Sequence, residues 1–179
     1  VTTGERLYVG DVSDPRRPAE RASIEVQGLR VRAASGHAWV LAEQWGWPVF
    51  YRFVTVVDAT EPTSPIVVDV LGQVDDVALL GARGVLVHRN AGLRVVEVTD
   101  GGDFAEVGRL DVRGLRVAAA AGLALVTSGT EPPGPGLQLV DVSTPDVPFR
   151  LGRCELASPD MALAGVPGLV AVAGADDAV

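Results

Sequence analysis

The strongest constraint on the fold is a short motif that occurs four times in this chain of 179 residues. Each copy has an apolar run rich in Val and Leu, then an acidic residue, then a Ser or Thr two positions later. Three copies continue with a proline two positions further on, at Pro15, Pro62 and Pro145. Proline has no N–H and pushes the preceding residue towards extended geometry, so a strand ends at each motif. The copies occupy residues 7–18, 53–65, 92–104 and 136–148.

The acidic residue of the motif gives the length of the repeat. Asp11, Asp58, Glu97 and Asp141 follow one another at intervals of 47, 39 and 44 residues. A period in the forties, filled with apolar runs of strand length and without apolar residues at helical spacing, is typical of β-propeller blades. The acidic and hydroxyl residues are interpreted as turn chemistry, because Ser and Thr side chains help to close turns by bonding nearby backbone.

Further short apolar runs between the motifs give sixteen predicted strands in four sets of four. The third strand of each set is the smallest and most apolar and contains Ala in every copy, which predicts that it lies at the crowded inner edge of a blade. We call it the Ala-rich strand. The strand after each acidic residue is then outermost. On this order the chain begins with two outer strands, at 7–26, and ends with two inner strands, at 161–173.

Half a blade at each end leaves open sheet edges, which invite association. The sequence is compatible with three ways of completing the ring. The ends complete one blade of a four-bladed ring, two chains combine, or the ring continues in flanking sequence. Because the chain starts almost directly in a strand, it is expected to be a piece of a longer polypeptide, and the last two closures are favoured.

The motif residues resemble a known repeat. The chain is similar to the LVIVD-repeat family, whose repeat reads as an apolar run, then D-V-S-D-P, then a second proline. The match is closest at 11–15 and 139–145 and covers nearly the whole chain in four copies. The third copy departs from it, with Glu97 for Asp and D-G-G at 100–102, so a looser turn is expected there. The resemblance implies a β-propeller and a bacterial protein that is secreted or attached to the cell surface. It implies no catalytic residues.

Composition excludes several functions. The formal net charge of −8 argues against nucleic acid as a partner, because phosphate binding needs a basic face. Cys154 is the only cysteine, so neither an internal disulfide nor a cysteine-based zinc site can form, and its thiol is expected to be buried on a strand. No apolar run is long enough to span a bilayer.

No catalytic constellation is apparent. His37 and His88 lie in different repeats without metal-ligand spacing. The acidic pairs Asp75-Asp76 and Asp176-Asp177 are interpreted as solvated charges in loops. The Gly-rich loop at 128–136 has neither a Lys nor a following helix, so it is not a phosphate-binding loop. We predict no catalytic residue, no metal site and no cofactor.

One segment has unusual content. Six of the nine aromatic residues lie between Trp39 and Phe53, and residues 43–52 are predicted to form an apolar loop. One interpretation is a satellite cluster folded onto its own blade. The other is a contact surface, because aromatic residues and Arg are enriched at interface anchors. The predicted partner-binding residues are Trp45, Trp47, Phe50, Tyr51 and Arg52.

The sequence therefore predicts an all-β fold, with residues 1–179 forming a single β-propeller domain or propeller segment of four LVIVD-like, four-stranded repeats. This unit is a complete ring, a fragment or part of a larger ring. The predicted function is a non-enzymatic binding or scaffold module that meets a protein partner, or further blades of the same or a second chain, through loops on one face. The alternative is an enzyme or small-ligand binder with its site at the propeller axis. An axial pocket with convergent polar groups favours the alternative, and an exposed patch around Trp45 and Trp47 favours the interaction module.

Overall fold

The computed structural model describes residues 5–46, 49–99, 103–128, 135–155, 161–166 and 169–174, with residues 45–46, 49–50, 161–166 and 169–174 described by their backbone alone. Every regular element in these ranges is a β-strand, so the fold is all-β as predicted. The strands are β1 (Arg6–Asp11), β2 (Ala19–Glu25), β3 (Arg30–Ala34), β4 (His37–Gly46), β5 (Val49–Asp58), β6 (Ile66–Gly72), β7 (Asp76–Leu80), β8 (Arg83–His88), β9 (Gly92–Val98), β10 (Phe104–Leu110), β11 (Arg116–Ala120), β12 (Leu123–Ser128), β13 (Gly136–Asp141), β14 (Phe149–Glu155), β15 (Met161–Val166) and β16 (Leu169–Gly174).

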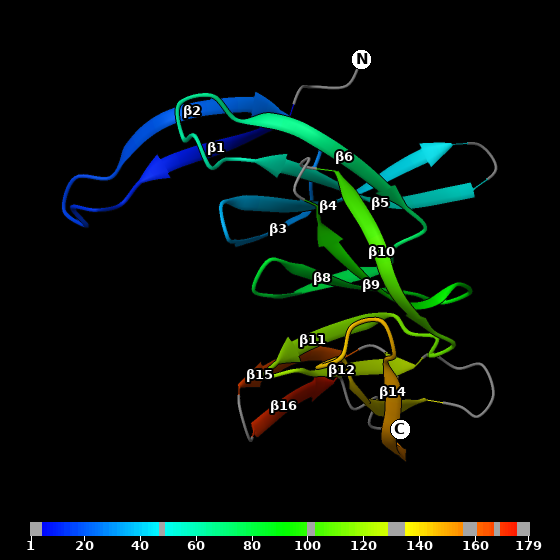
Figure 1. Cartoon of the computed structure of the whole chain (residues 1–179). Helices are drawn as coiled ribbons and strands as arrows, with labels where there is room; N and C mark the ends of the chain where they lie inside the picture. Colours follow the sequence, from blue (N-terminus) through cyan, green and yellow to red (C-terminus); the bar gives the residue numbers. More distant parts are fainter. Residues whose placement is uncertain are drawn as a thin grey trace. The chain divides into compact units, whose positions relative to one another are not determined.

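The strands form antiparallel meanders (Figure 1). Within the described residues, three sheets are four-stranded, β3–β6, β7–β10 and β11–β14, and two are hairpins, β1–β2 and β15–β16. Each four-stranded sheet joins the last two strands of one repeat to the first two of the next. The predicted order within a sheet is confirmed, because the Ala-rich strand is at one edge and the strand after the acidic residue is at the other.

The chain divides into two compact units, Val1–Gly72 and Gln73–Val179. In the first unit, the β1–β2 hairpin packs its apolar side chains on the sheet β3–β6. Burial of these side chains removes apolar surface from water and holds the hairpin against the sheet. The cluster consists of Val26, Ala38, Val40 and Val57, with Leu7 and Ile24 packed against it.

The core of the second unit lies between the sheets β7–β10 and β11–β14. Strand β11 contacts both β7 and β15, so the Ala-rich strands of neighbouring sheets lie together in this unit. Small side chains allow this close approach of backbones. The buried core residues are Ala78, Val85, Val87, Leu93, Val95, Val112, Val117, Ala124, Val126, Val140 and Val142.

The repeated acidic residue closes the turn that follows its strand. The carboxylate of Asp58 accepts hydrogen bonds from the Thr60 N–H at 2.8 Å and the Thr60 hydroxyl at 2.6 Å. Asp141 accepts the same two bonds from Ser143, at 2.8 and 2.5 Å. These bonds, the one from the hydroxyl first, lower the pKa of both carboxyls. The prediction of turn chemistry is therefore confirmed, although in both turns the hydroxyl bonds the carboxylate and not the backbone.

The third copy of the motif uses its acidic residue differently. Glu97 lies opposite Arg83 in the β8–β9 ladder, and the two side chains form an ion pair. The Thr99 N–H donates to the Asp103 carbonyl at 2.7 Å across the turn. The looser turn that we predicted at 100–102 lies outside the described residues.

A β-bulge recurs where the first two strands of a repeat pair. The ladder shifts between Val9 and Gly10 in β1–β2, and between Leu139 and Val140 in β13–β14. Equivalent shifts occur in β5–β6 and β9–β10. A bulge bends its strand and increases the local twist. The sequence patterns did not predict this feature.

Candidate functional site

Strands β4 and β5 continue together beyond the rest of their sheet (Figure 1). The β3–β4 ladder reaches only Leu41, and the β5–β6 ladder reaches only Phe53. The remaining rungs form a two-stranded ribbon of residues 43–46 and 49–52, which we call the ribbon. The predicted loop at 43–52 is therefore wrong. Aromatic residues favour extended strands, and the opposite charges of Glu43 and Arg52 pair across the ladder beyond the sheet.

The ribbon brings together four of the five residues that we predicted for partner binding. Trp45 lies opposite Phe50 in the ladder, and Tyr51 lies opposite Gln44. Tyr51 is 56% exposed. Arg52 donates from Nε to the Glu43 carboxylate at 2.6 Å, with both side chains half-buried. The structure describes Trp45 and Phe50 by their backbone alone, and Trp47 lies outside the described residues.

A buried polar cluster lies at the start of β7. Asp75 is only 3% exposed, and its carboxylate accepts hydrogen bonds from the Arg89 N–H at 2.8 Å and from Arg89 Nη2 at 2.7 Å. Burial opposes ionisation of Asp75, but the bonds and charge of Arg89 outweigh it and lower the pKa of this carboxyl. The interpretation of Asp75 as a solvated loop charge is therefore wrong.

His88 completes this cluster. Its Nδ1 accepts hydrogen bonds from the Asn90 N–H at 3.2 Å and the Ala91 N–H at 3.1 Å, and its Nε2 lies 4.0 Å from the Asp75 carboxylate. Burial lowers the pKa of His88, although the Asp75 charge opposes this change. An imidazole whose Nδ1 accepts two bonds is neutral and carries its proton on Nε2. The ring therefore closes the turn between β8 and β9.

Asp76 is also buried, at 4% exposed, which is again contrary to the prediction. Its carboxylate accepts a hydrogen bond from the Val117 N–H on β11 at 3.0 Å. Sequence reasoning missed both residues because it assigned the pair to a loop. Alignment of the repeats supplies the missing signal, since Asp75-Asp76 corresponds to Leu29-Arg30 and Leu115-Arg116, where the Ala-rich strand begins.

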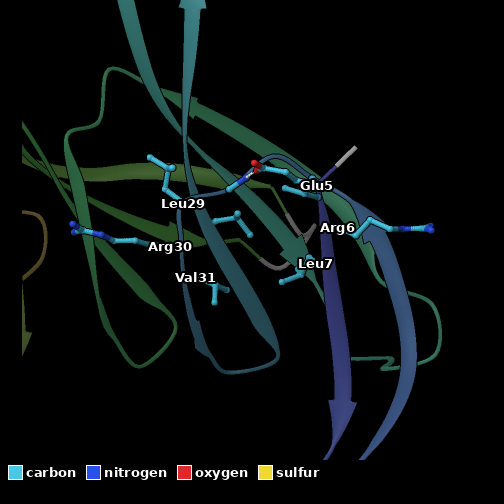
Figure 2. A pocket seen from close by; sticks show the side chains of 9 residues that line it. Glu5, Arg6, Leu7, Leu29, Arg30 and Val31 are labelled. Atoms are coloured by element: carbon cyan, nitrogen blue, oxygen red, sulfur yellow. Dashed lines mark hydrogen bonds between the residues drawn. The ribbon is translucent and has the colours of Figure 1, made fainter. Parts of the chain in front are cut away.

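A groove of about 380 Å³ lies in the first unit, beside the start of β1 (Figure 2). Its interior is mostly apolar, and the side chains of Arg6 and Arg30 extend away from it in opposite directions. The Glu5 carboxylate accepts a hydrogen bond from the Gly28 N–H at 2.7 Å and ties the two walls together. The lining residues are Glu5, Arg6, Leu7, Val26, Gly28, Leu29, Arg30, Val31 and Val40.

This groove suits an extended apolar segment better than a reaction. One wall is β1, which among the described residues pairs only with β2. An unpaired strand edge offers backbone donors and acceptors to an added strand. The groove has no convergent set of titratable side chains that would do acid–base chemistry.

The other candidates for chemistry are separate in the described structure. His37 lies at a hairpin turn, where its Nδ1 is 3.0 Å from the Ser35 carbonyl. Cys154 is exposed on β14, so its expected burial is wrong. Within the described residues, no group of three or more His, Cys, Asp or Glu side chains could hold a metal ion. Asp176-Asp177 and most of the loop at 128–136 lie outside these residues.

Two further findings bear on function. No helix in the described part of the chain has the length and apolar character needed to cross a membrane. Comparison of the chain with protein-family models finds no matching family, and comparison with curated proteins finds no match. The functional proposal therefore depends on the geometry of this chain.

Proposed function

We propose that this protein is a non-enzymatic binding or scaffold module that contacts a partner protein through the ribbon. The observation that carries the proposal is the extension of β4 and β5 beyond both neighbouring strands, with Tyr51 exposed on it. Among the described residues, residues 43–46 pair only with residues 49–52, so neither segment of the ribbon has a neighbouring strand on its other edge. A two-stranded ribbon with both edges open can add to a partner's sheet, while its side chains supply specificity.

The composition of the ribbon supports this function. Aromatic residues and Arg dominate binding hot spots, since they combine a large apolar area with a polar tip. The ion pair between Glu43 and Arg52 lies across the ladder and fixes the ribbon where it leaves the sheet. A prearranged ribbon loses less conformational entropy on binding than a flexible loop would.

We further propose that the sheets belong to one β-propeller of the LVIVD-repeat type that spans residues 1–179. Support comes from the repeated sheet order, from the contact of β11 with β7 and β15, and from the shared motif turns at Asp58 and Asp141. The resemblance of the repeated motif to the LVIVD repeat motivates the proposal that the protein is bacterial and works outside the cytoplasm, secreted or at the cell surface.

The test compares the proteins retained by three immobilised forms of the chain. The first is wild type, the second carries Trp45→Ala, Trp47→Ala and Tyr51→Ala, and the third carries Phe149→Ala. Phe149 is a matched control because it is an exposed aromatic residue on another strand, β14. We expect one protein to bind wild type and the Phe149 variant and to be lost with the ribbon variant. That protein is then purified, and its affinity for each form is measured.

Thermal unfolding of the same variants separates binding from packing. The proposal predicts that the ribbon variant melts within a few degrees of wild type. A large loss of melting temperature would show that the aromatic residues form a satellite core. Equal affinity of the purified partner for all three forms would also overturn the proposal.

The alternative function, an enzyme or small-ligand binder at the propeller axis, has less support. The buried acids Asp75 and Asp76 lie at the start of an Ala-rich strand, where such a site would be expected. However, Asp75 is bonded to Arg89 and Asp76 to the Val117 N–H. A ligand would have to replace these buried hydrogen bonds, and leaving either group unpaired costs free energy. These acids are therefore better explained as structural groups.

A further inference from the structure

A titratable side chain closes the turn between β8 and β9. Residues 89–91 connect His88, the last residue of β8, to Gly92, the first residue of β9. Nδ1 of His88 accepts hydrogen bonds from the Asn90 N–H at 3.2 Å and from the Ala91 N–H at 3.1 Å. A ring nitrogen accepts a hydrogen bond only while it carries no proton. These two bonds therefore exist only in the neutral form of His88.

The base of this turn is fixed by packing, whereas its tip is exposed. Gly92 is buried and has a φ of 81°, and a Cβ added to it would lie 2.6 Å from the Leu110 carbonyl oxygen. Glycine permits both this backbone conformation and this close approach. Residues 89–90, at the tip, are exposed. Loss of the bonds to Nδ1 would therefore open the tip of the turn and leave β8 and β9 paired.

The charges that face His88 come from the strands around it in the second unit. Burial is the largest effect on the pKa of His88 and lowers it from its ordinary value of 6.5. The Asp75 carboxylate, just before β7, lies 4.0 Å from Nε2 and raises the pKa. Arg89 in the turn and Arg94 on β9 lower it again. The ring is therefore neutral at neutral pH, as its two accepted hydrogen bonds require.

We propose that the β8–β9 turn is a pH-sensitive switch, which opens at residues 89–91 when His88 takes up a proton from the solvent. Protonation converts Nδ1 from an acceptor into a donor, so the Asn90 and Ala91 N–H groups both lose their bond to the ring. The imidazolium keeps a partner, because its Nε2 faces the Asp75 carboxylate. Acid therefore exchanges the bonds that close the turn for an attraction between the end of β8 and the start of β7.

The switch acts in mildly acidic solution. Because the folded-state pKa of His88 lies below 6.5, the unfolded chain takes up the proton first as the pH falls. The neutral ring therefore contributes stability that is fully present above the ordinary pKa and is lost as the pH falls through the folded-state pKa. His37 provides a contrast, since its Nδ1 lies 3.0 Å from the Ser35 carbonyl oxygen and is a donor whether or not the ring is charged.

Two variants at position 88 reproduce the two states of the switch. In His88→Asn, Oδ1 takes the place of Nδ1 and accepts from the same backbone amides, but it does not titrate. His88→Ala has no side-chain acceptor at any pH. We expect the turn of the wild type to behave like that of His88→Asn at neutral pH and like that of His88→Ala at about pH 4.5, where Asp75 is still ionised because its pKa is lowered.

Amide hydrogen exchange, measured by NMR and expressed as protection relative to an unfolded chain, reports the opening of the turn. A hydrogen bond of typical net strength favours the closed form by about tenfold, so protection of the Ala91 amide in the wild type should fall by about tenfold or more between neutral pH and about pH 4.5. His88→Asn should keep its protection over this range, and His88→Ala should lack it throughout. The Val95 amide, in the middle of β9, is the control for global unfolding and should stay protected at both pH values.

The nitrogen chemical shifts of the His88 ring give a second readout, which a purely structural role of the side chain would not require. We expect the proton on Nε2 at neutral pH and protons on both nitrogens in acid. A proton on Nδ1 at neutral pH would overturn the proposal, because that nitrogen could not then accept the two bonds. Wild-type protection of Asn90 and Ala91 that stays constant down to about pH 4.5 would also overturn it, as would an equal loss of protection in His88→Asn.

Discussion

The carboxylate of Asp76 on β7 accepts a hydrogen bond at 3.0 Å from the backbone N–H of Val117 on β11. The bond joins the edge strands of two different sheets. Within its own sheet β11 pairs only with β12, so its other edge has backbone donors that need partners. A buried carboxylate on the neighbouring strand supplies one partner where no further strand could fit between the sheets.

This relationship predicts the effect of removing the acceptor. We expect Asp76→Ala to lower the free energy of unfolding by about 2 kcal/mol, because the buried Val117 N–H would lose its partner. Asp76→Asn keeps an oxygen acceptor of the same size and should cost less than Asp76→Ala. Urea unfolding measures both. Equal losses in the two variants would contradict a role as acceptor for the β11 edge.

A second prediction concerns how acidic pH changes the contribution of Asp75 to the stability of the fold. The pKa of this carboxyl is lower in the folded protein than its ordinary value of 3.8, so its ionised form stabilises the fold. That contribution is fully present above the ordinary value and is lost as the pH falls through the lower, folded-state pKa. Asp75→Asn should therefore cost about 1.5–3 kcal/mol at neutral pH, the range for a hydrogen bond to a charged group.

The pH dependence distinguishes this effect from a general packing defect. The stabilities of wild type and Asp75→Asn should converge in strong acid, where the wild-type carboxyl is also protonated. Urea unfolding at neutral pH and at several values below 4 measures the difference. A difference that stays constant over this range would show that the charge of Asp75 does not contribute.

At Thr127 we predict a substitution that stabilises the fold, in contrast to the losses of stability predicted above. Its Oγ1 is fully buried and has no hydrogen-bond partner among the described residues. Thr127→Val replaces the hydroxyl by a methyl group of similar size, so we expect a gain of about 1 kcal/mol in the free energy of unfolding. The neighbouring Ser128→Ala is the control and should be destabilising, because the Ser128 hydroxyl donates to the Gly136 carbonyl at 3.2 Å. A loss of stability in Thr127→Val would indicate that the hydroxyl is bonded.

The sheets could be predicted from sequence because local signals repeat four times. The Asp58 and Asp141 turns, with a hydroxyl two positions on, mark strand ends in a way that one copy alone would not. The Ala-rich third strands identified the sheet edge that contacts its neighbours in the second unit. These features depend on turn chemistry and side-chain size, which sequence records directly.

The candidate sites were harder to predict because they depend on contacts between distant residues. The Asp76 carboxylate is buried by β11, which is 40 residues further along the chain. An adjacent acidic pair at a strand start has the same composition as a solvated loop, so only the packing distinguishes them. The ribbon was missed because residues 43–52 were assigned to a loop between two predicted strands. In the structure these residues continue the ladder of β4 and β5, with Glu43 opposite Arg52.

The last prediction compares two glycines that occupy equivalent places beside the recurring β-bulge. Gly108 on β10 lies opposite Val95, and Gly152 on β14 lies opposite Leu139. A Cβ added at Gly108 would lie 1.8 Å from the carbonyl oxygen of Pro145, whereas one added at Gly152 would meet no described atom within 4 Å. Gly108 therefore allows the strand β10 to approach the motif turn after β13.

We expect Gly108→Ala to lower the free energy of unfolding by about 2–3 kcal/mol, because the backbone at Pro145 would have to move. Gly152→Ala should change stability by less than about 0.5 kcal/mol, since its surroundings are open. Both variants add the same methyl group at the same place in the repeat, so effects on β-propensity and on the unfolded chain cancel in the comparison. Urea unfolding of the two variants measures the difference. Similar stabilities would show that β10 does not touch the Pro145 turn in solution.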